Sequence, residues 1–75
     1  MSDRLPAVTS REVIQKLRRA GFVFDRQAKG SHEIWLHPRT HRRVVIPNHP
    51  GTLPRGTLRA ILKQSGLTVE EFVEL

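Results

Sequence analysis

Residues 22–47 decide the fold, and they read FVFDRQAKGSHEIWLHPRTHRRVVIP. The stretch holds three runs rich in β-branched and aromatic residues, separated by polar or proline-containing segments. The first run opens with residues 22–24 and ends in the polar stretch 26–30, the second covers residues 31–37, and the third covers residues 43–46. Proline 47 then closes the third run, because proline cannot donate to a strand ladder. Three strands with short connections predict an antiparallel meander.

Helical patterns flank these strands on both sides. Thr9-Ser10-Arg11-Glu12 has the form of a capping box, and apolar residues at helical spacing follow as far as Gly21, so a helix is predicted over residues 10–20. A second helix is predicted over residues 54–64, with Leu58, Ile61 and Leu62 on its core face. Residues 68–71 repeat the capping-box form and begin a short acidic turn or helix anchored by Phe72.

The resulting order is α-β-β-β-α with a short C-terminal helical turn, which is an α+β fold. Two amphipathic helices cover one face of the three-stranded antiparallel sheet, and the other face meets solvent or a partner. The 75 residues allow a single domain with one modest core, and residues 1–8 are expected to be flexible. The sequence has no cysteine and no apolar run that could span a bilayer, so we expect a soluble, cytoplasmic protein without disulfides.

The distribution of charge points to a polyanionic partner. Thirteen Lys and Arg stand against seven Asp and Glu, a net charge of +6, and three of the acids lie in the last six residues. Residues 1–69 therefore carry thirteen positive and four negative side chains. Arg55, Arg59 and Lys63 recur every four residues and form a basic stripe on the second predicted helix. This excess favours binding to a nucleic-acid backbone, although charge can also serve solubility alone.

The acids and histidines do not favour a metal site or a cofactor. A two-metal nuclease needs several oxygen ligands, and only four acids precede the C-terminal turn. The four histidines at positions 32, 37, 41 and 49 do not match the spacing of zinc ligands. Imidazole can nevertheless accept and donate a proton near neutral pH, and RNA supplies its own nucleophile in the 2′-hydroxyl group.

His32 has the most suggestive setting, in Lys29-Gly30-Ser31-His32. Gly30 lets a ligand approach the backbone, Lys29 can meet a phosphate, and Ser31 adds a hydroxyl group. The alternative interpretation is an ordinary strand histidine after a hairpin glycine. The residue types alone leave both interpretations open.

Lys29-Gly30-Ser31-His32, followed by Trp35 and His37-Pro38, resembles the strand motif of the HicA toxins. Ile46-Pro47-Asn48-His49 and the later segment 56–67 (GTLRAILKQSGL) resemble the second signature of that family, and Glu70-Glu71-Phe72 resembles its usual ending. The resemblance covers nearly the whole chain from Thr9 onward, in order and without a gap. No single piece is specific, but the ordered set is.

The resemblance implies a fold similar to the double-stranded RNA-binding domain and an endoribonuclease that cleaves mRNA. From the small number of acids and the spacing of the histidines, we expect this endoribonuclease to be metal-independent. The resemblance also implies that His32 is the catalytic residue and that a HicB-type antitoxin neutralises the protein. His49 matches a recurrent family position, although it is also read as a loop histidine that bonds the start of the second helix. Phosphate-binding residues would then be Lys29, Gly30, Ser31, Arg26 and the stripe of Arg55, Arg59 and Lys63.

Strand alternation puts His32, Ile34 and Leu36 on one face of the second strand, and Ser31, Glu33, Trp35 and His37 on the other. Apolar content alone would bury Ile34 and Leu36, but the resemblance favours Trp35 beneath the helices. We therefore predict that His32 is exposed beside an apolar patch of Ile34 and Leu36, which suits a partner protein. Two alternatives remain: an RNA-binding module that does not cleave RNA, and a protein whose basic face meets an acidic partner.

Overall fold

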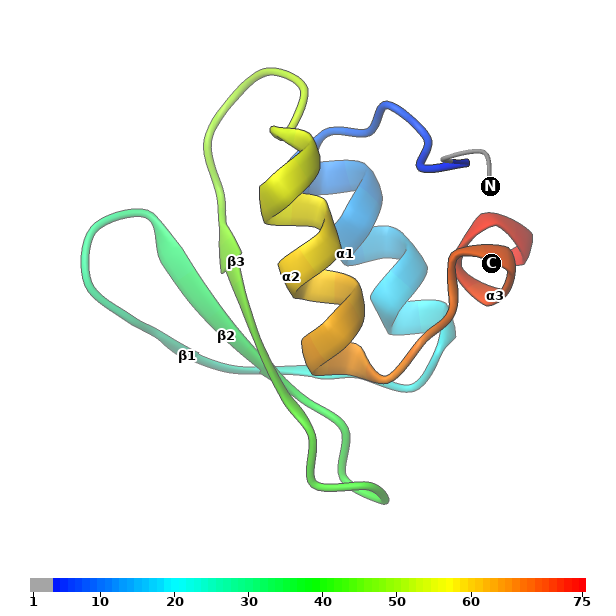
Figure 1. Ribbon diagram of the computed structural model, residues 1–75. Coiled ribbons are helices and arrows are strands. Elements are labelled where there is room, and N and C mark those ends of the chain that lie inside the picture. The colour runs from blue at the N-terminus through cyan, green and yellow to red at the C-terminus, as the bar shows by residue number, and fades with distance from the viewer. Residues whose placement is uncertain (1–3) are drawn as a thin grey trace.

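The computed structural model describes residues 4–75 and has the predicted α-β-β-β-α order, with a third short helix at the C-terminal end (Figure 1). The elements are α1 (Ser10–Arg19), β1 (Val23–Gln27), β2 (His32–Leu36), β3 (Arg43–Pro47), α2 (Arg55–Ser65) and α3 (Val69–Glu74). Both predicted capping boxes are present, because Thr9 pairs with Glu12 at the start of α1 and Thr68 with Glu71 at the start of α3. No helix within the described residues is long and apolar enough to cross a membrane.

The three strands form one antiparallel sheet in the order β1-β2-β3, which is the predicted meander. We expected the first strand to end at the polar stretch 26–30, but β1 continues through Arg26 and Gln27. It does so with a register shift between Phe24 and Arg26, so that Asp25 forms a bulge. Strand β3 forms the opposite edge of the sheet. Its last residue, Pro47, has no N–H group, so no donor is left without a partner there. The Val45 N–H donates to the Gln64 side chain at 2.8 Å.

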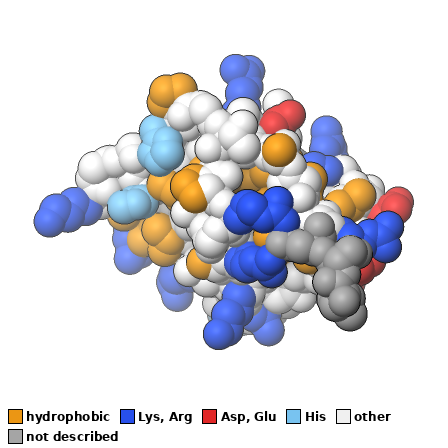
Figure 2. Space-filling view, turned by 45° about the horizontal axis from the view of Figure 1, so that its top comes forward, with side chains coloured by type: hydrophobic (Ala, Val, Ile, Leu, Met, Phe, Trp, Pro, Cys, Tyr) orange, Lys and Arg blue, Asp and Glu red, His pale blue; other side chains and the backbone are white. Residues whose placement is uncertain are grey.

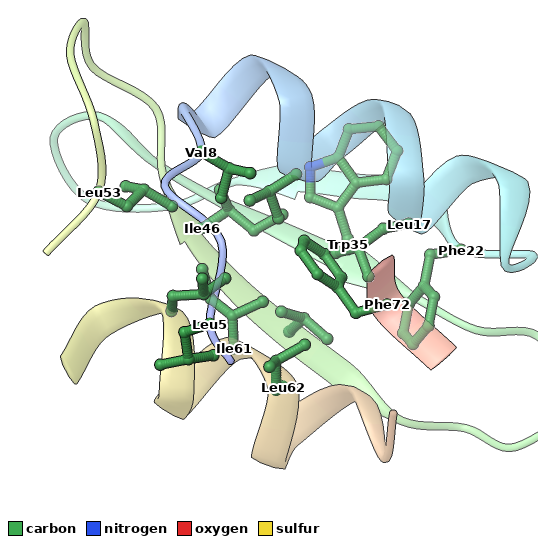
Figure 3. Packing of buried hydrophobic residues seen from close by; sticks show 13 residues of the cluster. Leu5, Val8, Leu17, Phe22, Trp35, Ile46, Leu53, Ile61, Leu62 and Phe72 are labelled. Atoms are coloured by element: carbon green, nitrogen blue, oxygen red, sulfur yellow. The ribbon is translucent and has the colours of Figure 1, made fainter. Parts of the chain in front are cut away.

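Helices α1 and α2 lie on the same face of the sheet, and α3 lies beside them on the side away from the β1–β2 turn (Figure 1). The sheet contributes Trp35, Val44 and Ile46 to the core, and all three are buried. Figure 3 shows Trp35 and Phe72 among the apolar side chains that fill the space between sheet and helices. Trp35 retains 2% of its surface, so the predicted choice of strand face is confirmed.

The segment before α1 differs from the expectation that residues 1–8 are flexible. Residues 1–3 lie outside the described part of the chain, but Leu5 and Val8 are buried in the core. The Leu53 N–H donates to the Val8 carbonyl at 2.8 Å, which ties this segment to the β3–α2 connection. Leu5 and Val8 are apolar and pack into the same core as the helices and the sheet, and burying them removes apolar surface from water.

Candidate functional site

The β1–β2 turn presents its backbone to solvent. Gly30 adopts φ +62°, a left-handed conformation that favours glycine, and no atom lies within 4 Å of where a Cβ would stand. The Ala28 N–H donates to the His32 carbonyl at 2.8 Å, and the Gln27 side chain donates to the carbonyls of Gly30 and His32 at 3.1 and 3.0 Å. Gln27, which the sequence interpretation did not single out, therefore fixes the turn that carries Lys29, Gly30 and Ser31.

His32 follows this turn as the first residue of β2, on the face of the sheet that no helix covers. Its side chain lies on the opposite face from the buried Trp35, and it is exposed as predicted. Within residues 4–75 neither ring nitrogen of His32 takes part in a hydrogen bond. Both nitrogens are therefore available to a bound ligand.

An apolar surface adjoins His32 on the uncovered face. Ile34 and Leu36 lie on this face and are half-buried rather than fully exposed, because their strand neighbours shield them. Val23 pairs with Leu36 and Val45 pairs with Ile34, so both valines share the face, and they are 48% and 41% exposed. We call Val23, Ile34, Leu36 and Val45 the open-face patch. It is broader than the sequence alone predicted.

The β3–α2 loop brings His49 to the same end of the sheet. The Asn48 N–H donates to the Ser31 carbonyl at 2.9 Å, which places the loop beside the turn that precedes His32. The buried Ser10 hydroxyl donates to the Pro47 carbonyl at 2.6 Å and to the His49 carbonyl at 3.4 Å, so α1 holds the loop. Figure 2 shows two histidine side chains close to each other, among hydrophobic side chains.

The ring of His49 does not make the predicted bond to the start of the second helix. Its Nδ1 lies 3.5 Å from the Pro50 carbonyl, a long contact within its own loop. The side chain is exposed. The expectation failed because the irregular loop continues from His49 to Pro54 before α2 begins, and its hydrogen bonds run to α1 instead.

Glu33 links the loop to the core, and nothing in its sequence context predicted this role. Its two carboxylate oxygens accept hydrogen bonds from Trp35 Nε1 at 3.1 Å and from Asn48 Nδ2 at 2.5 Å. Glu33 lies on the helix-covered face, opposite to His32. The contact with Asn48 could not be read from the sequence, because the two residues are fifteen positions apart.

The predicted phosphate-binding residues do not all lie on one face. Lys29 and Arg26 are exposed near the turn, but Arg26 also forms an ion pair with Asp25 at 3.2 Å. The stripe of Arg55, Arg59 and Lys63 is exposed on α2, in the helical layer and not on the face of His32. The structure thus groups the turn with His32 and separates the α2 stripe from it.

His37 has a structural role. Its Nε2 lies 3.1 Å from the Ala20 carbonyl, and its Nδ1 accepts from the N–H groups of Arg39 and Thr40 at 3.2 and 3.3 Å. Across residues 4–75 no group of three or more His, Asp or Glu side chains is placed to hold a metal ion.

Two comparisons with known proteins bear on this site. Residues 10–67 match a family model described as the HicA toxin of bacterial toxin–antitoxin systems. The matched region includes every candidate site residue named above. No curated protein matches the chain at a significant level.

Proposed function

Because the chain belongs to the HicA toxin family of bacterial toxin–antitoxin systems, we propose that it is an endoribonuclease toxin that cleaves mRNA, with His32 as the proton-transfer group and without a metal. The observation that carries this proposal is the exposed His32 ring, whose two nitrogens are free, beside a turn with an open backbone. An mRNA substrate implies that the toxin acts in the bacterial cytoplasm.

The chemistry needs one base, one acid and a phosphate-binding surface. The His32 imidazole accepts the proton of the ribose 2′-hydroxyl, whose oxygen then attacks the adjacent phosphorus. The bond from phosphorus to the 5′-oxygen breaks, and that oxygen takes up a proton as it leaves. The products are a 2′,3′-cyclic phosphate and a 5′-hydroxyl end, so no metal-bound water is required. His49, held on the neighbouring loop, is the candidate second group for this proton transfer.

Lys29, Gly30 and Ser31 are the residues best placed to hold the reacting phosphate, since they precede His32 in the exposed turn. The Lys29 ammonium group supplies charge, and the Ser31 hydroxyl supplies a donor. Arg26 and the α2 stripe (Arg55, Arg59 and Lys63) would contact phosphates farther along the RNA. These contacts fix the position of the strand and make binding sensitive to salt.

The test compares two histidine variants on one RNA in the presence of EDTA. His32→Ala is expected to lower cleavage by about 10²–10⁴-fold, the usual contribution of a general acid or base. His41→Ala is the matched control, because His41 is also exposed but lies in the β2–β3 connection at the other end of β2. Full cleavage by a folded His32→Ala variant would contradict the proposal. RNA that stays intact but binds tightly and in a salt-sensitive way would instead indicate a non-catalytic RNA-binding module.

The open-face patch supports a second part of the proposal, a HicB-type antitoxin as partner. An exposed apolar surface next to His32 suits a protein that covers the reacting group and blocks RNA. Val45→Lys should leave the toxin active but prevent rescue of growth by a co-expressed HicB-type antitoxin. Val73→Lys is the control, since Val73 is 48% exposed but lies on α3, away from the sheet. Normal rescue of the Val45→Lys variant would count against this binding surface.

A further inference from the structure

A hollow of about 400 Å³ lies between α1 and the β3–α2 loop. We call it the α1 groove. Its lining residues are Arg11, Ile14, Gln15 and Arg18 from the helix and Asn48 from the loop. None of the five belongs to the phosphate-binding residues that the sequence predicted.

The polar side chains of the α1 groove lie on one side of the helix. Arg11, Gln15 and Arg18 are spaced at i, i+4 and i+7, and all three are exposed. Neither arginine forms an ion pair with a carboxylate within residues 4–75. Two positive charges thus face a shared hollow and neither is held in an ion pair within the described part of the chain, which favours an anionic ligand.

Two of the side chains that line the groove, Arg18 and Asn48, are linked to the core through Trp35 and Glu33. The Arg18 guanidinium lies 5.2 Å from the centre of the buried Trp35 ring, a cation–π contact that holds it over the sheet. Trp35 in turn donates to Glu33, which also accepts from the Asn48 side-chain amide. The Asn48 side-chain oxygen accepts no hydrogen bond within the described residues, so it is free to accept one from a ligand.

The groove also adjoins the proposed cleavage site. Asn48 lines it and donates its backbone N–H to the Ser31 carbonyl, one residue before His32. An RNA strand that passes the exposed end of β2 therefore meets His32 on one face of the sheet and the groove on the other. Arginine guanidinium groups suit phosphate oxygens, and the Gln15 and Asn48 amides can pair with a base edge or a 2′-hydroxyl.

We propose that the α1 groove is a binding subsite for single-stranded RNA, which takes a nucleotide flanking the cleaved bond. Arg11 and Arg18 contact its phosphates, and Gln15 and Asn48 contact its base or ribose. This inference rests on the proposed ribonuclease function, since that function makes RNA the ligand.

The test uses a short single-stranded RNA and the His32→Ala protein, which keeps the RNA intact. The double variant Arg11→Gln/Arg18→Gln should raise the Kd for this RNA at least tenfold. The plot of the logarithm of the binding constant against the logarithm of the salt concentration should become less steep by about 1.4, for two lost phosphate contacts. Arg19→Gln is the matched control, because it removes a charge from an exposed position of α1 that does not line the groove. Its salt slope should change by less than half as much.

A second variant separates binding from packing, since Arg18 also contacts Trp35. Arg18→Lys keeps the charge but loses the planar guanidinium group over Trp35, so it should bind RNA more tightly than a single Arg18→Gln variant does and less tightly than the parent protein. The melting temperatures of the two single variants show how much of the change is due to packing. In the protein that retains His32, the double variant should raise KM with a much smaller change in kcat.

The outcomes separate this inference from the proposed function. If the double variant binds RNA like the Arg19→Gln control while His32-dependent cleavage persists, the groove inference is overturned alone. If the groove variants weaken RNA binding but neither they nor the parent protein cleave RNA, the groove stands as an RNA-binding site, while the proposed cleavage falls and with it the placement of the groove beside a cleaved bond. If the groove variants weaken antitoxin binding and leave the RNA affinity unchanged, the groove binds a protein and not RNA, which also overturns the inference.

Discussion

The two ends of β2 carry histidines with opposite surroundings. His32 begins the strand on the uncovered face, exposed and with both ring nitrogens free of bonds within residues 4–75. His37 follows the strand on the helix-covered side, where its ring contacts the Phe22 ring edge-on at 5.1 Å. Its nitrogens bond the Ala20 carbonyl and two N–H groups of the following turn.

The hydrogen bonds of His37 assign one chemical form to its ring. Nδ1 accepts from Arg39 and Thr40, so it carries no proton, and Nε2 must then donate to the Ala20 carbonyl. Proton transfer at this ring would break bonds that join α1 to the β2–β3 connection. His37 therefore has a structural role at one end of the strand, whereas the ring of His32 at the other end is available for proton transfer.

The largest expected effect follows from the reaction assigned to His32. An RNA in which every 2′-hydroxyl is replaced by 2′-O-methyl has no nucleophile, so its cleavage should fall below detection. The natural RNA should yield 2′,3′-cyclic phosphate and 5′-hydroxyl ends when its products are analysed. Cleavage of the methylated RNA, or products with 5′-phosphate ends, would reject this route.

Gly21→Ala should disturb the packing of His37 and lower the free energy of unfolding. Gly21 has φ +104°, and an added Cβ would lie 2.7 Å from His37 Nε2. Strain of this kind costs about 1–3 kcal/mol in the free energy of unfolding, measured by urea denaturation. Gly56→Ala is the control, because nothing lies within 4 Å of its added Cβ. Alanine there should be neutral or stabilising by up to about 1 kcal/mol. Equal stabilities of the two variants would contradict the account.

His37→Ala should cost about 1–2 kcal/mol, because three hydrogen bonds of a half-buried ring are lost. His32→Ala should change the free energy of unfolding by no more than about 0.5 kcal/mol, as expected for an exposed side chain without ring bonds. Thermal and urea unfolding of both proteins give this comparison. A larger loss at position 32 than at position 37 would reverse the assignment of roles.

A smaller loss than that of His37→Ala is expected for Ser10→Ala. The Ser10 hydroxyl is 1% exposed and donates to the Pro47 carbonyl, so its removal should cost about 1 kcal/mol. The same change should loosen the loop of His49, which faster amide hydrogen exchange in residues 48–52 would reveal. Unchanged exchange there would show that Ser10 does not hold the loop.

Much of the fold could be predicted from local patterns. The capping boxes at Thr9 and Thr68 and the three β-rich runs depend on neighbouring residues, so the order of elements follows from them. The strand alternation around Trp35 left two choices of face, and the family resemblance selected the one that the structure confirms. The exposure of His32 could thus be predicted.

Features that depend on contacts between distant segments could not be predicted. The bulge at Asp25, the packing of Leu5 and Val8, and the link from Glu33 to Asn48 all depend on topology and not on local pattern. The α1 groove is another case, since its helix and its loop are thirty residues or more apart in sequence.

The most direct test of the different roles of the two histidines is kcat/KM for His32→Ala and His37→Ala, measured on one RNA and normalised to the folded fraction. If only His32 transfers protons, kcat/KM falls by about 10²–10⁴-fold at position 32 and stays within a few-fold of the parent value at position 37. A comparable loss at both positions, or a larger loss at position 37, would contradict these roles.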